Sequence, residues 1–183
     1  MKRIVLLVFI LASVHNAMAQ RYFTREGNVK FFSEAPMENI EATTNKALCI
    51  IDLAKGQVAV DMLIKSFEFE KKLMEEHFNE NYMESDKFPK ATYKGKFEVP
   101  EGLEQMKDGN YLVPVIGEIT IHGEKQKLEL PVELVVSEGK INTRFEFVVK
   151  VEDHKIKIPN VVINNVAEEI LVTADFSLDP YNR

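Results

Sequence analysis

The clearest pattern in the chain is an alternation of apolar and polar residues along several segments. Residues 141–152 are the best example, because Ile141, Phe145 and Phe147 occupy odd positions while mostly polar residues occupy even ones. A period of two places the two sets on opposite faces of a β-strand. The same alternation predicts further strands at 27–33, 39–44, 48–53, 57–65, 91–98, 111–122, 128–136 and 170–178.

Short turns join many of these strands. Residues 54–56, 122–125 and 137–140 each contain a glycine and separate two alternating segments. Such turns favour antiparallel pairing of consecutive strands, and closing the resulting meander removes its exposed edges. We therefore predict an all-β fold, an elongated antiparallel up-and-down β-barrel of about eight strands.

One segment departs from the strand pattern. Residues 69–83 are rich in Glu, Lys, Leu and Met, which favour helix, and lack strong alternation. The less polar side chains fall on one helical face, and these are Leu73, Met74, His77 and Phe78. We predict one short helix there, packed across an end of the sheet.

The inward faces of the strands carry large apolar side chains. If the barrel is hollow, we expect its lumen to be lined by Phe31, Val60, Met62, Ile64, Phe97, Val115, Ile119, Phe145, Phe147 and Phe176. We expect a lid or mouth formed by Leu73, Met74, His77, Phe78 and Phe88. The alternative is a solid barrel, because the side chains of small barrels can fill their interior.

The first 19 residues have the layout of a secretory signal peptide. Lys2 and Arg3 precede an apolar run at 4–14, and Ala17-Met18-Ala19 has the small residues of a cleavage site. We expect cleavage after Ala19, a periplasmic or secreted protein, and a single domain over 20–183. The apolar run is shorter than the roughly 20 residues that span a bilayer, so no stable membrane anchor is expected.

The charge and the cysteine content argue against a nucleic-acid partner and against a disulfide. The formal net charge is −6 and no basic run occurs, which argues against a nucleic-acid partner. Cys49 is the only cysteine, so no intrachain disulfide can form. Its apolar neighbours predict a buried and unreactive thiol.

Motifs for catalysis are absent from the sequence. The three histidines beyond the predicted signal are far apart and lack metal-ligand spacing, and no G-x-S-x-G elbow or glycine-rich phosphate loop occurs. One helix end could gather a divalent ion, although a solvated acidic face is the commoner outcome for Glu75, Glu76, His77 and Glu80. We expect no enzyme, metal or cofactor; the alternative is an enzyme that uses His77 with nearby carboxylates.

Two motifs resemble those of the YceI-like proteins. Thr120-Ile121-His122-Gly123, followed by Leu130-Pro131-Val132, resembles the T-I-H/R-G and L-P/D-V hairpin of that family. The segment 77–93, with Phe88-Pro89-Lys90-Ala91, resembles the family's H-L…F-F-D-x-x-x-Y-P-x-A-x-F segment. The resemblance covers roughly residues 27–178.

This resemblance implies an exported bacterial protein with a lipocalin-like barrel, whose best-known relatives hold a polyisoprenoid chain in the lumen. We therefore expect a lipid-binding protein that sequesters or transports an isoprenoid-like, fatty-acid-like or other long apolar molecule. An envelope stress or interaction protein with a filled barrel is the alternative. A homodimer stays open at this point.

Overall fold

The computed structural model describes residues 21–162 and 164–181, so the predicted signal peptide lies outside the described residues. The strands are β1 (Arg21–Glu34), β2 (Asn39–Asp52), β3 (Gln57–Leu63), β4 (Glu68–Phe69), β5 (Lys90–Lys96), β6 (Gly109–Ile121), β7 (Glu124–Ser137), β8 (Lys140–Lys150) and β9 (Glu169–Pro180). The α-helices are α1 (Lys72–His77) and α2 (Glu101–Glu104), and 3-10 turns occupy Ile64–Ser66, Glu152–His154 and Asn160–Val162.

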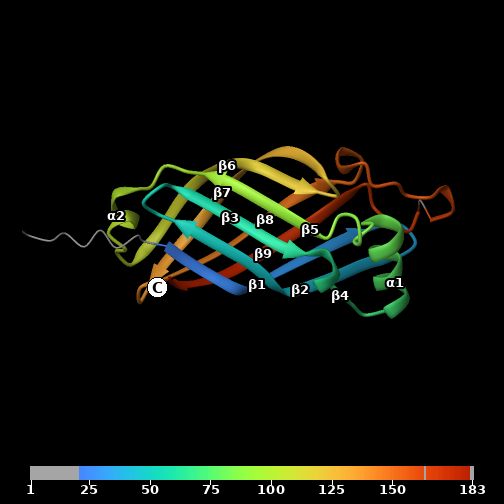
Figure 1. Cartoon of the computed structure of the whole chain (residues 1–183), viewed down its shortest axis with the longest axis horizontal. Helices are drawn as coiled ribbons and strands as arrows, with labels where there is room; N and C mark the ends of the chain where they lie inside the picture. The colour runs from blue at the N-terminus through green and yellow to red at the C-terminus, as the bar shows by residue number, and fades with distance from the viewer. Residues whose placement is uncertain (1–20, 163, 182–183) are drawn as a thin grey trace, which may run out of the picture.

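Eight of these strands close into an antiparallel barrel (Figure 1). Around the barrel the order is β1, β2, β3, β5, β6, β7, β8 and β9, and β9 then pairs with β1. Each strand therefore pairs with its neighbours in the chain, β4 being a short addition to the edge of β2. The predicted all-β up-and-down barrel is confirmed.

The predictions for the first two strands differ from the structure in detail. β1 begins at Arg21, before the predicted start at residue 27, and β2 is one strand where two were predicted. Gly27 on β1 pairs with Ala47 on β2, and Val29 pairs with Thr44. β2 therefore has one more residue than β1 between these two pairs. The polar residues 45–46 thus form a bulge, whereas the sequence pattern suggested a break.

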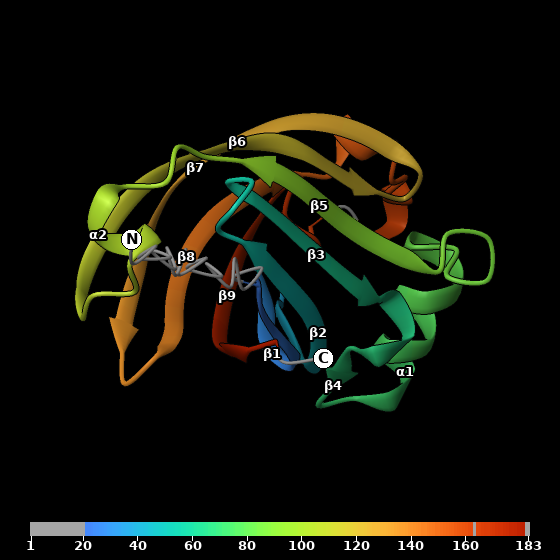
Figure 2. The same cartoon turned by 60° about the vertical axis from the view of Figure 1, so that its left-hand side comes forward.

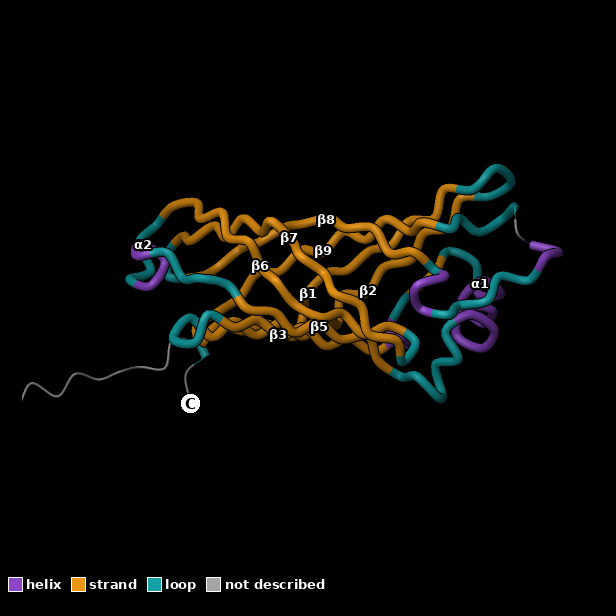
Figure 3. The backbone as a smooth tube through the Cα atoms, turned by 90° about the horizontal axis from the view of Figure 1, so that it is seen from above, coloured by secondary structure: helices purple, strands orange, loops and turns teal. Residues whose placement is uncertain are grey.

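The two ends of the barrel carry different caps (Figure 3). At one end, β4 leads into α1, and a π-helical turn at Phe78–Tyr82 continues it, so the helix predicted at 69–83 is shorter and begins later. At the other end, α2 lies in the segment 100–110, where the sequence analysis predicted neither a strand nor a helix. Its Leu103 is fully buried and closes that end.

Two prolines limit the pairing of β6 and β7 with their other neighbours. Pro114 and Pro131 lie directly opposite each other in the β6–β7 ladder. Proline has no N–H to donate, so this pair fits only where both nitrogens point away from each other. The β7–β8 ladder accordingly ends at Glu133 and Arg144, before Pro131, and β7 arches away from β8 (Figure 2).

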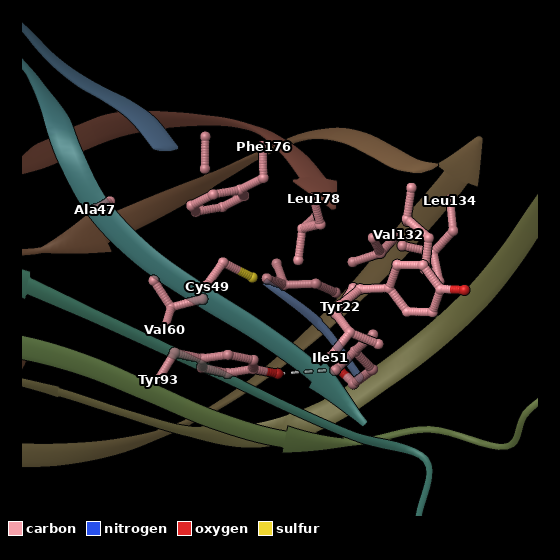
Figure 4. Close-up of a cluster of buried hydrophobic side chains, with 14 of the residues drawn as sticks. Tyr22, Ala47, Cys49, Ile51, Val60, Tyr93, Val132, Leu134, Phe176 and Leu178 are labelled. Carbon is pink, nitrogen blue, oxygen red and sulfur yellow. Dashed lines mark hydrogen bonds between the residues drawn. The ribbon is translucent and has the colours of Figure 1, made fainter. Parts of the chain in front are cut away.

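The half of the barrel near α2 is packed solid. Its buried side chains come from most of the strands (Figure 4) and include Tyr22, Cys49, Ile51, Val113, Val132, Leu134, Ile141 and Leu178. Burial raises the pKa of the Cys49 thiol to about 12, which removes the reactive thiolate at neutral pH. Within the described part of the chain, no helix has the length and apolar character needed to cross a bilayer.

Candidate functional site: an apolar cavity at the α1 end

The half of the barrel near α1 is hollow. It encloses a cavity of about 290 Å³ whose walls are formed by nearly all the barrel strands, by α1, and by the loop between β8 and β9. Apolar side chains dominate the lining. This volume is just below the roughly 300–1,000 Å³ range of ligand pockets.

Two aromatic rings form the floor between the hollow and the packed half. Phe176 covers Gly27, where a side-chain carbon would lie 2.3 Å from two ring atoms, and Tyr93 covers Gly117, where such a carbon would lie 2.8 Å from Cζ. Figure 4 shows the Phe176 ring on one side of Cys49 and the Tyr93 ring on the other, with Val60 beside Tyr93. Glycine at position 27 leaves room for the Phe176 ring to lie over the neighbouring strand, and Gly117 leaves room both for the Tyr93 ring and for the backbone of Lys94 and Gly95.

Hydrogen bonding holds the floor ring of Tyr93 in place. Its hydroxyl lies 3.3 Å from the carbonyl oxygen of Val115 and 3.2 Å from that of Leu128, on neighbouring strands. The single hydroxyl proton is shared between these two acceptors. Burial, with a smaller contribution from Glu129, raises the pKa of Tyr93, so the hydroxyl stays neutral.

A cluster of four phenylalanines anchors α1 at the mouth of the cavity. The Phe78 ring, just after α1, lies 5.3 Å from Phe31, 5.9 Å from Phe67 and 5.0 Å from Phe69, measured between ring centroids. Pairs at such distances stabilise by about 0.5–1.5 kcal/mol each beyond their buried area. The cluster therefore holds the short helix over one side of the opening, which its few internal hydrogen bonds would not do alone.

The rim of the cavity is its polar part. Glu38, His77, Tyr82 and Asn165 contribute to the lining there. Glu38 accepts a hydrogen bond from Lys71 Nζ at 2.7 Å, an exposed pair that raises the pKa of Lys71 and links the β1–β2 turn to the start of α1. A molecule with an apolar tail and a polar head would thus place its head at this rim.

Deeper in the wall, Ser33 secures the loop that precedes β9. It is only 2% exposed, and its hydroxyl oxygen accepts a hydrogen bond from the Ala167 N–H at 2.9 Å. This contact holds Asn165 and Val166 against the cavity.

His122 ties three segments together beside the mouth. Its Nδ1 lies 3.0 Å from the carbonyl oxygen of His154, its Nε2 lies 3.0 Å from Glu84 Oε2, and its ring packs edge-on against Phe88. The His-Gly turn therefore positions the loop after the π-helical turn and the 3-10 turn after β8.

Most of the residues predicted for the lumen lie around this cavity. Those that line it are Phe31, Val60, Met62, Ile64, Ile119, Phe145, Phe147 and Phe176, together with Met74, His77 and Phe78 from the predicted lid. Phe97 and Val115 lie outside the cavity, because they belong to the packed half below the Tyr93 floor.

Two predicted lid residues also lie elsewhere. Leu73 points into solvent, 62% exposed, because α1 turns only Met74 and His77 toward the cavity. Phe88 packs on His122 and Gly123 at the outside of the mouth.

The sequence analysis missed several lining residues. The sequence analysis assigned neither a strand nor a helix to the segment 153–165, yet Ile156 and Ile158 line the cavity from it. Their spacing of two residues was the available signal. Leu128 and Leu130 on β7, and Val172 on β9, also line it and were on the inward phase of predicted strands.

The acidic residues near His77 do not assemble a metal centre. Across residues 21–162 and 164–181, no group of three or more His, Cys, Asp or Glu side chains is arranged to hold a metal ion. His77 is exposed at the rim, where it meets the apolar cavity.

The fold and both motifs agree with the comparison to known families. The YceI-like domain matches residues 21–178. The chain belongs to the YceI-like family. No curated protein sequence matches the chain.

Solved structures have the same fold at low sequence identity. A polyisoprenoid-binding domain from Saccharophagus degradans, implicated in plant cell wall breakdown, has a TM-score of 0.75 at 12% identity, covering 89% of this chain and 99% of that one. BcnA from Burkholderia cenocepacia has a TM-score of 0.67 at 17% identity, covering 83% and 95%. The Campylobacter jejuni YceI protein has a TM-score of 0.57 at 16% identity and covers all of both chains.

Proposed function

We propose that this protein binds one long apolar molecule, tail first, in the cavity at the α1 end, and sequesters or carries it without chemical change. The observation that carries this proposal is a cavity with apolar walls, an aromatic floor and a polar rim. An isoprenoid-like or acyl tail matches the walls, and a small polar head matches Glu38, His77, Tyr82 and Asn165. The polyisoprenoid-binding domain that shares the fold supports a ligand of this class.

The size of the cavity limits how much of the ligand is enclosed. A water-sized group takes up about 30 Å³ in a liquid and needs at least about 15 Å³ of cavity volume. A cavity of 290 Å³ therefore admits on the order of ten to twenty methylene-sized groups. An isoprenoid of three or four units or a common fatty acid fits this range. A longer polyprenyl chain would extend beyond the mouth.

We also propose that the protein acts outside the cytoplasm, after removal of residues 1–19. The basic start, apolar run and small-residue site of that segment support export. The amino-terminal residue of the protein purified from its native host tests it: Gln20 is expected, and an intact Met1 or Lys2 would contradict it.

Extraction of the natively purified protein with organic solvent, followed by mass spectrometry, tests the binding function. We expect one class of long apolar molecule in near-stoichiometric amount. The variant Ala174→Phe adds a ring to the cavity wall and should copurify with little lipid, whereas Leu112→Phe, on the exposed outer face of β6, should retain it. Folding of both variants is checked by circular dichroism. Recovery of no lipid from the wild-type protein, or of equal amounts from both variants, would contradict the proposal.

A further inference from the structure

The outer wall of the barrel near the α2 end carries a second concave surface. An open groove of about 600 Å³ lies over β1, β2, β3 and β5, strands that are labelled together in Figure 1. It is separate from the lipid cavity, because the packed half of the core, including Cys49 and Ile51, lies beneath it.

The strand register explains the shape of this groove. Phe23, Ile50, Ala59 and Lys94 lie side by side across the four strands, and the alternation turns them outward. Alanine is the shortest of the four, so Ala59 and the 37%-exposed Ile50 form an apolar floor between two taller sides. The Phe23 ring meets Tyr181 edge-on at 5.1 Å between centroids, which makes one side aromatic.

The sides of the groove are strongly basic. Arg21, Arg25, Lys55, Lys94 and Lys96 all line it, and the single lining carboxylate is Asp52. Asp52 forms a salt bridge with Arg21, whose Nε lies 3.0 Å from Asp52 Oδ2.

The other four cations have no carboxylate partner among the described residues. Glu118 is opposite Lys94 in the β5–β6 register but bonds Lys125 at 2.8 Å. Elsewhere in the described chain, only Lys107, Lys127 and Lys157 are similarly unpaired. Four of the seven unpaired cations of the described residues thus line one groove of an acidic protein.

Such a surface favours an anionic partner. Neighbouring outward residues on a strand are about 7 Å apart, so Lys94 and Lys96 repel each other until an anion lies between them. A phosphate can accept hydrogen bonds from more than one cation, and the floor offers apolar contact to the rest of the ligand. We propose that this groove binds a small anion with a flat apolar body and a phosphate group. This site goes beyond the proposed lipid carriage and does not depend on it.

Calorimetric titration with 1-naphthyl phosphate tests the proposal, with 1-naphthol and inorganic phosphate as the two fragments. We expect one site that binds naphthyl phosphate at least tenfold more tightly than either fragment. Chemical-shift changes in NMR spectra should centre on Phe23, Ile50 and Ala59. Shifts centred on the lipid cavity would overturn the assignment.

Matched variants separate a built site from general positive charge. Lys94→Gln with Lys96→Gln should weaken naphthyl phosphate binding at least tenfold, whereas Lys107→Gln with Lys127→Gln makes the same charge change elsewhere and should leave it unchanged. Ala59→Phe fills the floor without changing charge and should abolish binding. Equal weakening in both lysine pairs, an unaffected Ala59→Phe variant, or binding only to vesicles of anionic phospholipid would overturn the proposal.

Discussion

Phe176 sets the depth of the cavity, so its replacement should change which ligands the protein prefers. The side chain is 1% exposed and its ring forms the floor over Gly27. Phe176→Ala removes six ring carbons, which frees space for roughly three to four methylene groups at the packing density of a protein interior. At about 0.8 kcal/mol per buried methylene, a ligand longer by that amount should gain about 2.4–3.2 kcal/mol, or about 50- to 200-fold in affinity.

Displacement of a fluorescent acyl probe by saturated fatty acids of increasing length measures this preference. The optimum length should increase by about three to four carbons in Phe176→Ala relative to the wild-type protein. The free energy of unfolding should fall by about 3–5 kcal/mol without ligand. A saturating long ligand should restore part of this loss, because it binds only the folded state.

Phe97→Ala is the matched control. Phe97 is also an inward phenylalanine, but it packs against the solid half and does not line the cavity. Its loss should lower the free energy of unfolding without changing the optimum ligand length. The reasoning is refuted if Phe176→Ala keeps the wild-type optimum, or if Phe97→Ala changes it equally.

Three further predictions concern stability and access. Cys49 should resist alkylation by iodoacetamide in the folded protein and react only on unfolding, because burial raises the pKa of its thiol to about 12; labelling of the native protein on the timescale of a free thiol would contradict this. Burial lowers the pKa of His154 below its ordinary value, so the unfolded chain takes up a proton at a higher pH than the folded protein does. The free energy of unfolding should therefore fall as pH drops from about 7 through 6, with a slope of at most about 1.4 kcal/mol per pH unit. Denaturant titrations at several pH values measure this slope, and the part due to His154 should be missing in His154→Gln. The same slope in the wild-type protein and the variant would count against the prediction. Phe78→Ala removes three aromatic contacts and should lower the free energy of unfolding by about 2–3 kcal/mol, somewhat less than the loss of a fully buried phenylalanine. Amide hydrogen exchange should accelerate in α1 and the following turn. Unchanged exchange there would show that other contacts hold the helix.

The sequence analysis predicted the barrel because the information it used is local. Period-two alternation identifies a strand and its inward face, and short glycine turns decide that consecutive strands pair. Its errors were also local in origin. The bulge at residues 45–46 looked like a strand break, and α2 was missed because a four-residue helix has almost no periodic signal, although Leu103 was an isolated apolar residue in a polar segment.

The candidate site was predicted less completely, for a geometric reason. Phe97 and Val115 have the same inward phase as Met62 and Ile119, yet only the latter two line the cavity. Alternation reports which face a side chain occupies and contains no information on its height in the barrel. That height depends on strand tilt and on the relative register of strands that are distant in the chain.

By itself, the sequence determined the strands, their inward faces, their antiparallel order and the family. Only the tertiary structure decided that Tyr93 and Phe176 lie over glycines on neighbouring strands and form the floor between a solid half and a hollow half of the barrel. The same holds for the basic groove, where β1, β2, β3 and β5 bring Arg25 and Lys94 together from distant parts of the chain. Both features depend on contacts between strands, and the pattern along any single strand cannot encode the side chains of its neighbours.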